Sequence, residues 1–259
     1  MHDGPPIGEP RSVRNLFEHD DTVVDLLDPY RDASRIPHRS PCWVMANMVS
    51  GIDGTAAVDG RVGALSAGAD AELFLRMRGL ADVVLVGAET VRRERYRQVH
   101  LSGDLRDERR LVGRAPNPPI AVVSRSLDLD WSSPLFVTDD TSATTLVITC
   151  RDAPLDKLPA GVDAIIAGTD RVDIGAAVQA LADRGFTVVL CEGGPTRLGE
   201  IVTSDLLDER CRTLSPVMGG DDVPIARASE LANLARFRLV YAAVDDGTLF
   251  LRYLAEAEP

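Results

Sequence analysis

Hydrophobic residues gather in short runs from residue 42 onward. The runs cover residues 42–49, 82–87, 119–124, 134–138, 145–150, 162–168 and 187–194. They are rich in Val and Ile and contain few polar positions, which is typical of strands that are covered on both faces. The pattern therefore predicts a sheet whose strands are mostly buried.

Segments of helical period lie between these runs. Residues 69–82 place Leu73, Met77 and Leu80 on one stripe. Residues 172–185 do the same with Val172, Ala176 and Leu181, and end at Gly185 as a helix C-cap would. Strands that alternate with helices predict an α/β fold, with a largely parallel twisted sheet and helices on both faces.

The residue pattern at the two ends of the chain differs from the alternating strands and helices between them. Two alternating segments within residues 236–254 flank the sequence DDG at 245–247, which predicts an antiparallel C-terminal hairpin. Residues 1–40 are rich in Pro, Asp, Arg and His and hold one amphipathic piece at 22–30. We expect them to form an N-terminal arm or a short helical extension, and residues 41–259 to form a single domain. The APNPP sequence at 115–119, after the charged run 103–110, is expected to be a solvated loop.

The charge, the hydrophobic runs and the cysteines of the chain argue against several classes of protein. A net charge of −12 argues against a nucleic-acid surface, because phosphate backbones are held by clustered Lys and Arg. The chain contains no run of about 20 apolar residues, which a membrane span needs, and its start lacks the layout of a signal peptide. We expect a cytoplasmic protein. The four cysteines form no CxxC pair and no HxE motif occurs, so a zinc site lacks its ligands.

Three predicted strands end in residues that suit phosphate groups, and ligands of open α/β sheets bind beyond such ends. Gly87 and Thr90 follow one strand, where a helix N-terminus could hold a pyrophosphate. Capping of that helix by Thr90 or Glu89 is the alternative. Ser124 and Arg125 follow another and could hold a 2′-phosphate, although they also suit an ordinary polar turn.

The third end is LCEGGPTRLG, residues 190–199. Gly193 and Gly194 have no Cβ and would let a phosphate approach their amides, while Pro195 suits the start of a helix. Glu192 stands at the strand end, where a carboxylate is costly to bury without a partner. No GxGxxG or Walker A sequence follows any strand, so a dinucleotide site would need another fold.

Four segments together carry a resemblance to a known family: 48–54, 75–96, 190–199 and 206–224. Their order and spacing resemble those of the riboflavin-biosynthesis pyrimidine reductases, the reductase domain of the RibD/RibG enzymes, which has a dihydrofolate-reductase-like fold. The likeness covers roughly residues 42–254. We expect a stand-alone reductase, because the residues of this sequence lack the zinc ligands of the deaminase domain that the bifunctional enzymes carry. The resemblance implies a homodimer formed through the sheet, and the apolar late hairpin is an edge that must be paired or covered.

The resemblance implies NADPH as cofactor. Ser50 would lie beside the nicotinamide, Ser124 beside the 2′-phosphate, and Gly194 to Leu198 under the pyrophosphate. The full set of expected cofactor-binding residues is Ser50, Gly87, Thr90, Glu94, Ser124, Arg125, Gly193, Gly194, Pro195, Thr196 and Leu198.

The resemblance also implies a substrate site. Glu192 matches the glutamate that recognises the pyrimidine, and Arg78 matches an arginine on the substrate side. Asn47 stands where the bifunctional reductases commonly have a lysine, and Gly51 where they have a serine. The expected substrate-binding residues are Asn47, Asp53, Arg78 and Glu192, and the expected catalytic residues are Glu192 and Asp70. For Asp70 the alternative is a first-turn carboxylate that the helix dipole favours.

The implied reaction is reduction of 5-amino-6-(5-phosphoribosylamino)uracil to its ribitylamino counterpart, by hydride transfer from NADPH to C1 of the opened ribose. A dihydrofolate or other pterin reductase of the same fold is a second possibility. A protein that binds NADP(H) without turnover is a third, which the loss of the lysine at Asn47 favours.

Overall fold

The computed structural model describes residues 14–16, 25–31, 35–66, 68–137, 144–227 and 235–256. Within them one sheet has ten strands in the order β1-β9-β10-β8-β2-β7-β3-β4-β5-β6. The strands are β1 (Arg14–Asn15), β2 (Trp43–Ser50), β3 (Val83–Gly87), β4 (Ile120–Val123), β5 (Leu146–Thr149), β6 (Asp163–Ile166), β7 (Val188–Cys191), β8 (Glu209–Leu214), β9 (Phe237–Asp245) and β10 (Thr248–Ala255). The helices are α1 (Ala69–Met77), α2 (Ala88–Glu94), α3 (Gly103–Leu111), α4 (Ile174–Asp183) and α5 (Gly194–Thr203), with short 3-10 helices at Asp28–Tyr30, Arg78–Leu80 and Leu155–Lys157.

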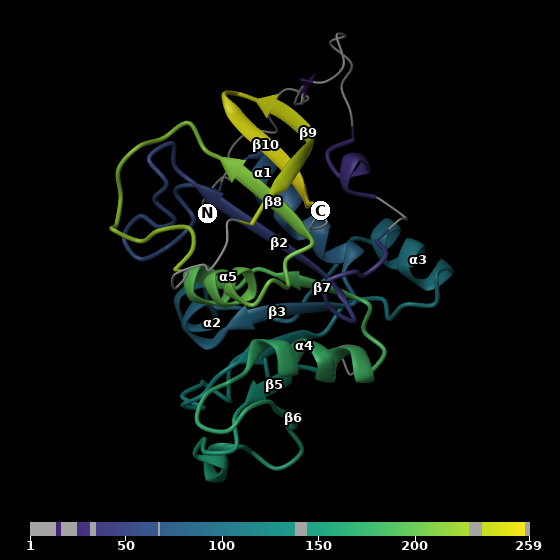
Figure 1. Cartoon of the computed structure of the whole chain (residues 1–259), viewed down its shortest axis with the longest axis vertical. Helices are drawn as coiled ribbons and strands as arrows, with labels where there is room; N and C mark the ends of the chain where they lie inside the picture. Colours follow the sequence, from purple (N-terminus) through teal and green to yellow (C-terminus); the bar gives the residue numbers. More distant parts are fainter. Residues whose placement is uncertain are drawn as a thin grey trace, which may run out of the picture.

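Parallel pairing links β8, β2, β7, β3, β4, β5 and β6, whereas β10, β9 and β1 join antiparallel at one end. Figure 1 shows the hairpin β9–β10 at one end of the sheet and β6 at the other. The hairpin turn consists of Asp246 and Gly247, with φ of 45° and 75°. Positive φ at both central residues is the geometry that a tight hairpin needs. The predicted α/β fold and C-terminal hairpin are confirmed.

Two hydrophobic layers cover the sheet. Along β3 the side chains alternate, so that Val84 and Val86 join one layer while Val83 and Leu85 join the other. The first layer contains residues of α1, α2 and α3, and the second contains residues of α4 and α5. Helices therefore lie on both faces, and the central strands are fully buried because each face has its own cover.

Several local predictions were wrong. Residues 134–137 form turns rather than a strand, and Thr138 lies outside the described residues. Leu135 is fully buried and the Phe136 ring lies 4.8 Å from the Trp131 ring between centroids, but Val137 is 64% exposed, so the described part of this run is only partly buried and does not join the sheet. In α4 the predicted Ala176 is exposed, because the buried stripe instead consists of Ile174, Ala177, Val178 and Leu181.

The charged run at 103–110 forms most of helix α3, a helix that the sequence pattern did not predict. Its residues Leu105 and Arg109 are buried. Because they are four positions apart, they lie on the same side of the helix, and this side packs against the rest of the domain. The loop at 115–119 is only partly solvated. Asn117 is 3% exposed, and its Oδ1 accepts a hydrogen bond from the Leu101 amide at 3.0 Å.

The described parts of residues 1–40 pack against the rest of the chain. β1 pairs with β9, and Leu26, Leu27 and Tyr30 join the first hydrophobic layer. Of the predicted amphipathic piece, residues 22–24 lie outside the described residues, and Asp28–Tyr30 form a 3-10 helix.

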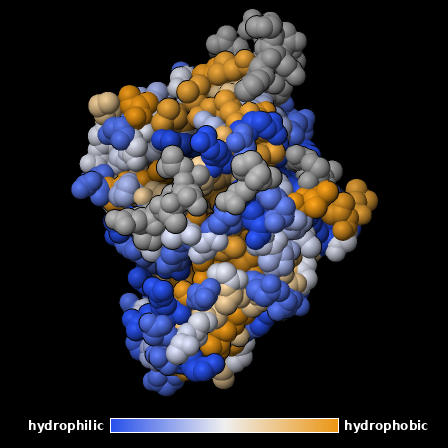
Figure 2. All heavy atoms as spheres, in the orientation of Figure 1, coloured by the Kyte–Doolittle hydropathy of each residue, from blue (hydrophilic) through white to orange (hydrophobic). Residues whose placement is uncertain are grey.

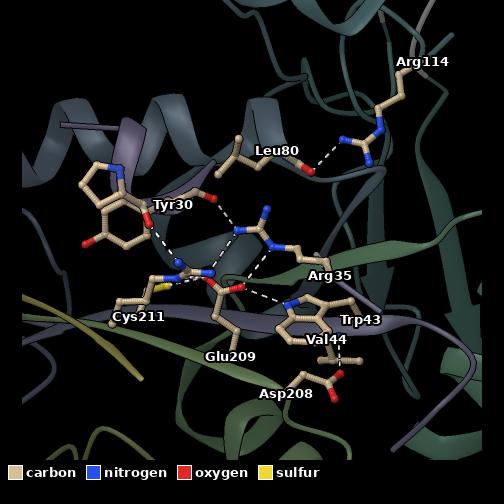
Figure 3. A network of polar contacts seen from close by, with 11 residues as sticks. Tyr30, Arg35, Trp43, Val44, Leu80, Arg114, Asp208, Glu209 and Cys211 are labelled. Carbon is tan, nitrogen blue, oxygen red and sulfur yellow. Dashed lines mark hydrogen bonds and ion pairs between the residues drawn. The ribbon is translucent and has the colours of Figure 1, made fainter. Parts of the chain in front are cut away.

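A buried carboxylate, Glu209, ties this segment to the sheet (Figure 3). It accepts hydrogen bonds from Arg252 Nε at 2.7 Å, Trp43 Nε1 at 2.9 Å and Arg35 Nε at 3.0 Å. Burial raises the pKa of Glu209, but the two guanidinium charges outweigh burial and hold it below its ordinary value. The network therefore joins residue 35 to β2, β8 and β10 through one ion cluster.

Candidate active site: two adjoining cavities

Two cavities open beside the carboxyl ends of β3, β4, β7 and β2. The first has a volume of about 490 Å³ and lies beyond β3, β4 and β7. The second, of about 470 Å³, lies between β2, α1 and the segment after α2. Both are lined by Thr90, Arg93, Gly194, Pro195 and Val223, so they adjoin. Their position is the one at which open α/β sheets bind ligands.

Bare backbone forms one wall of the first cavity. Gly194 has a φ of +73°, and a Cβ at this position would lie 2.6 Å from Thr90 Oγ1. A Cβ at Gly193 would lie 3.1 Å from the Gly87 amide nitrogen. The position of Gly194 therefore suits only glycine without strain, and a side chain at Gly193 would crowd the backbone of β3. Helix α5 starts here with Pro195 in its first turn, so its free N–H groups are available to an anion.

The residues after β4 and at the start of α2 complete this cavity. Ser124 is buried, and its Oγ accepts a hydrogen bond from the Leu127 amide, so it shapes a turn while it lines the cavity. Arg125 donates from Nε to the Asp170 carbonyl at 2.6 Å. At the N-terminus of α2 no side chain caps the helix, so capping does not account for Thr90.

Three arginines that were not among the predicted site residues also contribute to this wall. Arg93, Arg197 and Arg227 line the first cavity together with the predicted Arg125. Arg93 pairs with Glu89 at 2.7 Å, and Arg197 pairs with Glu200. Arg197 falls within the quoted stretch 190–199, but nothing in its sequence context distinguishes it from a surface arginine.

One face of α1 and the turn that follows it lines the second cavity. Asp70, Phe74 and Arg78 are spaced four residues apart, which places them in line on that face. The Arg78 guanidinium lies 4.5 Å from the centre of the Phe74 ring. The face therefore presents a carboxyl group, an aromatic ring and a cation in succession.

Arg78 and Glu192 form a buried, two-pronged ion pair. Arg78 donates from Nε to Oε1 and from Nη2 to Oε2 of Glu192, both at 2.7 Å. Tyr96 donates its hydroxyl to Oε2 at 2.9 Å. Burial lowers the pKa of Arg78, but the Glu192 carboxylate more than offsets this and raises it. Burial, with the Glu192 charge next, raises the pKa of Tyr96.

These contacts use three of the roughly four acceptor positions of the Glu192 carboxylate. Glu192 is therefore held by the protein itself, and it presents Arg78 and Tyr96 to the cavity. Tyr96 is a site residue that the sequence analysis did not single out. It ends the quoted segment 75–96, and only the fold brings it to Glu192.

Asp70 is 4% exposed and accepts a hydrogen bond from the Ser66 hydroxyl. Burial raises its pKa, and hydrogen bonds from Ser66 and Thr213 act in the opposite direction. Asn47, on β2, is 6% exposed, and its Oδ1 has no hydrogen-bond partner among the described residues. Glu94 accepts a hydrogen bond from the Val62 amide at 3.1 Å. The second cavity thus holds polar oxygens that still have capacity to accept.

The predicted residues divide into those inside and outside the cavities. Gly87, Thr90, Ser124, Arg125, Gly193, Gly194, Pro195 and Thr196 line the first cavity, and Asn47, Asp70, Arg78, Glu94 and Glu192 line the second. Three others do not line either. Ser50 is buried and accepts from Arg212 Nη2 at 3.0 Å, Leu198 packs in the second hydrophobic layer, and Asp53 is exposed and caps a turn through the Thr55 and Gly219 amides.

Residues 42–249 match the family described as RibD C-terminal domain. The chain belongs to this family. Among curated relatives, the 2,5-diamino-6-ribosylamino-4(3H)-pyrimidinone 5′-phosphate reductase of Archaeoglobus fulgidus is 27% identical over 187 residues, which are 70% of this chain and 84% of that protein. The reductase of the same name from Aquifex aeolicus is 28% identical over 172 residues, 63% of this chain and 71% of that protein.

Solved structures of similar proteins have the same fold. A pyrimidine reductase-like protein of Corynebacterium diphtheriae superposes with a TM-score of 0.77 at 29% identity, covering 84% of this chain and 93% of that chain. A riboflavin biosynthesis reductase of Saccharomyces cerevisiae shares the fold, with a TM-score of 0.63 at 13% identity, covering 89% of this chain and 98% of that chain. The predicted family is confirmed, and with it an oxidoreductase of the riboflavin-biosynthesis type.

The described residues contain no group of His, Cys, Asp and Glu side chains arranged to hold a metal ion. No helix among them combines the length and the apolar character that crossing a membrane requires.

Proposed function

We propose that this chain is an NADPH-dependent reductase that converts the ribosylamino side chain of a phosphorylated 6-ribosylaminopyrimidine into a ribitylamino group. The observation that carries the proposal is that the two cavities adjoin at Thr90, Gly194 and Pro195. Hydride transfer requires cofactor and substrate to lie within contact distance, and adjoining cavities allow this.

The first cavity fits a nicotinamide dinucleotide phosphate. The bare backbone at Gly193 and Gly194, with the α5 N-terminus, suits the pyrophosphate. Ser124 and Arg125 suit the 2′-phosphate, because a hydroxyl and a guanidinium are natural donors to it. When bound, the cofactor would supply the hydride. The protein would orient the two reactants and exclude water.

The second cavity fits the pyrimidine. We assign Asp70 to contact with the substrate and Arg78 to the recognition of its oxygen atoms. Glu192 would act through Arg78 and Tyr96 by holding both side chains in place. The substrate predicted from the resemblance is the uracil form, whereas the relatives are named for the 2,5-diamino-4(3H)-pyrimidinone form. Both carry the same phosphorylated ribosylamino group, so the reaction is the same.

The test is the oxidation of NADPH by the purified protein with each pyrimidine and with dihydrofolate, with the product identified by mass spectrometry. Turnover of a ribosylaminopyrimidine, with a gain of one hydride and one proton in the product, supports the proposal. Turnover of dihydrofolate alone would assign the chain to pterin reduction. Tight NADPH binding without turnover of any substrate would make it a nucleotide-binding protein.

We further propose that the protein is a cytoplasmic homodimer that associates through β8 and β10. Leu249, Leu251 and Tyr253 share one half-buried face of β10, and Figure 2 shows hydrophobic residues gathered over the hairpin. On β8, buried nitrogen atoms of Arg210 and Arg212 have no hydrogen-bond partner among the described residues. A second copy could cover the apolar face and supply acceptors. Light scattering that shows only monomer at micromolar concentration would contradict the dimer.

A further inference from the structure

We propose that Arg93, which lies where the two cavities meet, couples the binding of the cofactor to that of the substrate by lowering the repulsion between their phosphate groups. The inference rests on the proposed function, in which both ligands carry phosphate, and it adds a residue that links the two parts of the site. Arg93 was not among the predicted site residues, and neither the family match nor the names of the relatives assign it a role.

Helix α2 forms a wall between the two cavities. Ala88 and Glu89 line the first cavity only, and Glu94 lines the second only. Thr90 and Arg93 line both. Because a helix turns by about 100° per residue, these two shared residues lie between Glu89 and Glu94 around the helix axis. The strip of α2 that carries Thr90 and Arg93 therefore faces the junction of the cavities.

Arg93 supplies the charge at this junction. The other described residues that line both cavities are uncharged, namely Thr90, Gly194, Pro195 and Val223. Since the backbone at Gly194 is proposed to hold the pyrophosphate, the cofactor brings negative charge to the junction, and a phosphorylated substrate brings more to the adjoining cavity.

The two negative charges are close enough to repel one another. A compact cavity of about 470 Å³ is about 10 Å across, which is no more than the distance over which moderate salt screens a charge. A substrate phosphate in the second cavity therefore interacts with a pyrophosphate at the junction. A cation placed between two anions attracts both and offsets their repulsion.

The Arg93 side chain is accessible to ligands. It is 50% exposed, and it pairs with Glu89, which is 57% exposed, at 2.7 Å. An exposed pair four residues apart on a helix contributes little to stability, so the guanidinium can turn toward a ligand at little cost. Arg78 differs in this respect, because it is buried and held by two hydrogen bonds to Glu192. Arg93 is therefore a cation that can follow the bound phosphates.

The test is calorimetry with NADP⁺ and the ribosylaminopyrimidine phosphate, each titrated alone and with the other at saturation. NADP⁺ has no hydride to transfer, so the complex with both ligands does not react. The coupling is the ratio of the NADP⁺ Kd without the pyrimidine to that with it. We expect Arg93→Gln to lower this ratio at least about fivefold, which is the lower end of the usual range for coupled sites. Arg93→Lys keeps the charge and should retain most of the coupling.

Arg92→Gln is the matched control. Arg92 is the neighbouring exposed arginine of α2, and its loss changes the net charge equally. Its Nη1 donates to the Asp128 carbonyl at 2.7 Å, and its side chain lines neither cavity. The ratio should therefore stay at the wild-type value. By linkage, the Kd of the pyrimidine must change by the same factor as that of NADP⁺ in every variant, which checks each measurement.

An unchanged ratio in Arg93→Gln, or an equal fall in Arg92→Gln, would overturn the inference and leave the proposed function intact, because both ligands still bind. A fall in Arg93→Lys as large as in Arg93→Gln would also overturn it, since the charge would then not be the cause. If the wild-type protein binds NADP⁺ but no pyrimidine phosphate, the proposed function fails and the inference fails with it. The titrations of the wild-type protein thus distinguish the two failures.

Discussion

The Glu192 carboxylate is the charge on which the substrate side of the site is built, and Glu192→Gln removes it with little change of shape. The side chain is fully buried and accepts two hydrogen bonds from Arg78 and one from Tyr96. Glutamine keeps one acceptor oxygen but places an amide NH₂ where a donor now points. At least one of these donors must therefore lose its acceptor.

The size of the effect follows from these contacts. Breaking a buried ion pair by removing one partner costs about 3–5 kcal/mol. Because glutamine keeps one oxygen, we expect the free energy of unfolding to fall by about 2–4 kcal/mol. A domain with a stability of roughly 5–15 kcal/mol remains folded after such a loss. Turnover should fall about 100-fold, since a displacement of Arg78 by about 1 Å is enough for that.

NADPH binding should hardly change, because none of the three hydrogen bonds involves a group that holds the cofactor in the proposed function. The assays are urea unfolding, NADPH titration and initial rates. Glu209→Gln is the matched control, because Glu209 is a buried carboxylate between Arg35 and Arg252 that lines neither cavity. It should lose similar stability and keep the wild-type kcat/KM. Wild-type turnover in Glu192→Gln, or an equal loss of turnover and NADPH affinity, would refute this reasoning.

Three further predictions concern the first cavity and the fold. Gly194→Ala places a Cβ 2.6 Å from Thr90 Oγ1 at a φ of +73°. It should weaken NADPH binding about tenfold through strain of about 1–2 kcal/mol. An unchanged Kd for NADPH by calorimetry would contradict the proposal that the backbone at Gly193 and Gly194 holds the pyrophosphate. Arg125→Ala should weaken the binding of NADPH about tenfold more than that of NADH, so an equal loss would show that Arg125 does not contact the 2′-phosphate. Burial raises the pKa of Asp208, which lies beside His38, to about 6. The pKa of Asp208 in the folded state lies above that in the unfolded state. As pH rises from about 4 to about 6, the wild-type protein should therefore lose up to about 3 kcal/mol of unfolding free energy relative to Asp208→Asn. If the unfolding free energies of the two proteins change in parallel with pH, this prediction is wrong.

Local signals were sufficient for most of the fold. The strands β2 to β5 and β7 coincide with apolar runs because central strands are buried on both faces and tolerate few polar residues. The hairpin turn was predictable because Asp246 and Gly247 accept the positive φ that it needs. The run at 134–138 shows where such signals fail. A short apolar run can lie in turns, with Leu135 alone fully buried, as well as in a sheet, and only tertiary contacts decide between the two.

The sequence predicted the part of the candidate site that is formed by the backbone of neighbouring residues. It did not predict the part that is formed by hydrogen bonds between side chains far apart in the chain. The sequence has Gly193, Gly194 and Pro195 next to one another. Glycine has no side chain and proline has a fixed φ, so each restricts the local backbone in a way that can be predicted without the fold. The partners of Glu192 are 114 and 96 residues away along the chain. No period or spacing links such positions. The sequence therefore indicated that Glu192 needs a partner, but the fold was required to identify Arg78 and Tyr96.

The same distinction explains how a chain with a net charge of −12 can hold an anionic cofactor. The described residues that line the first cavity include four arginines and two carboxylates, namely Arg93, Arg125, Arg197, Arg227, Glu89 and Asp152. They carry a local surplus of positive charge that the α5 N-terminus increases. Charges on the distant surface are screened beyond about 10 Å at moderate salt. A bound phosphate is therefore governed by the lining of the cavity, and the sign of the whole chain does not decide what the site can bind.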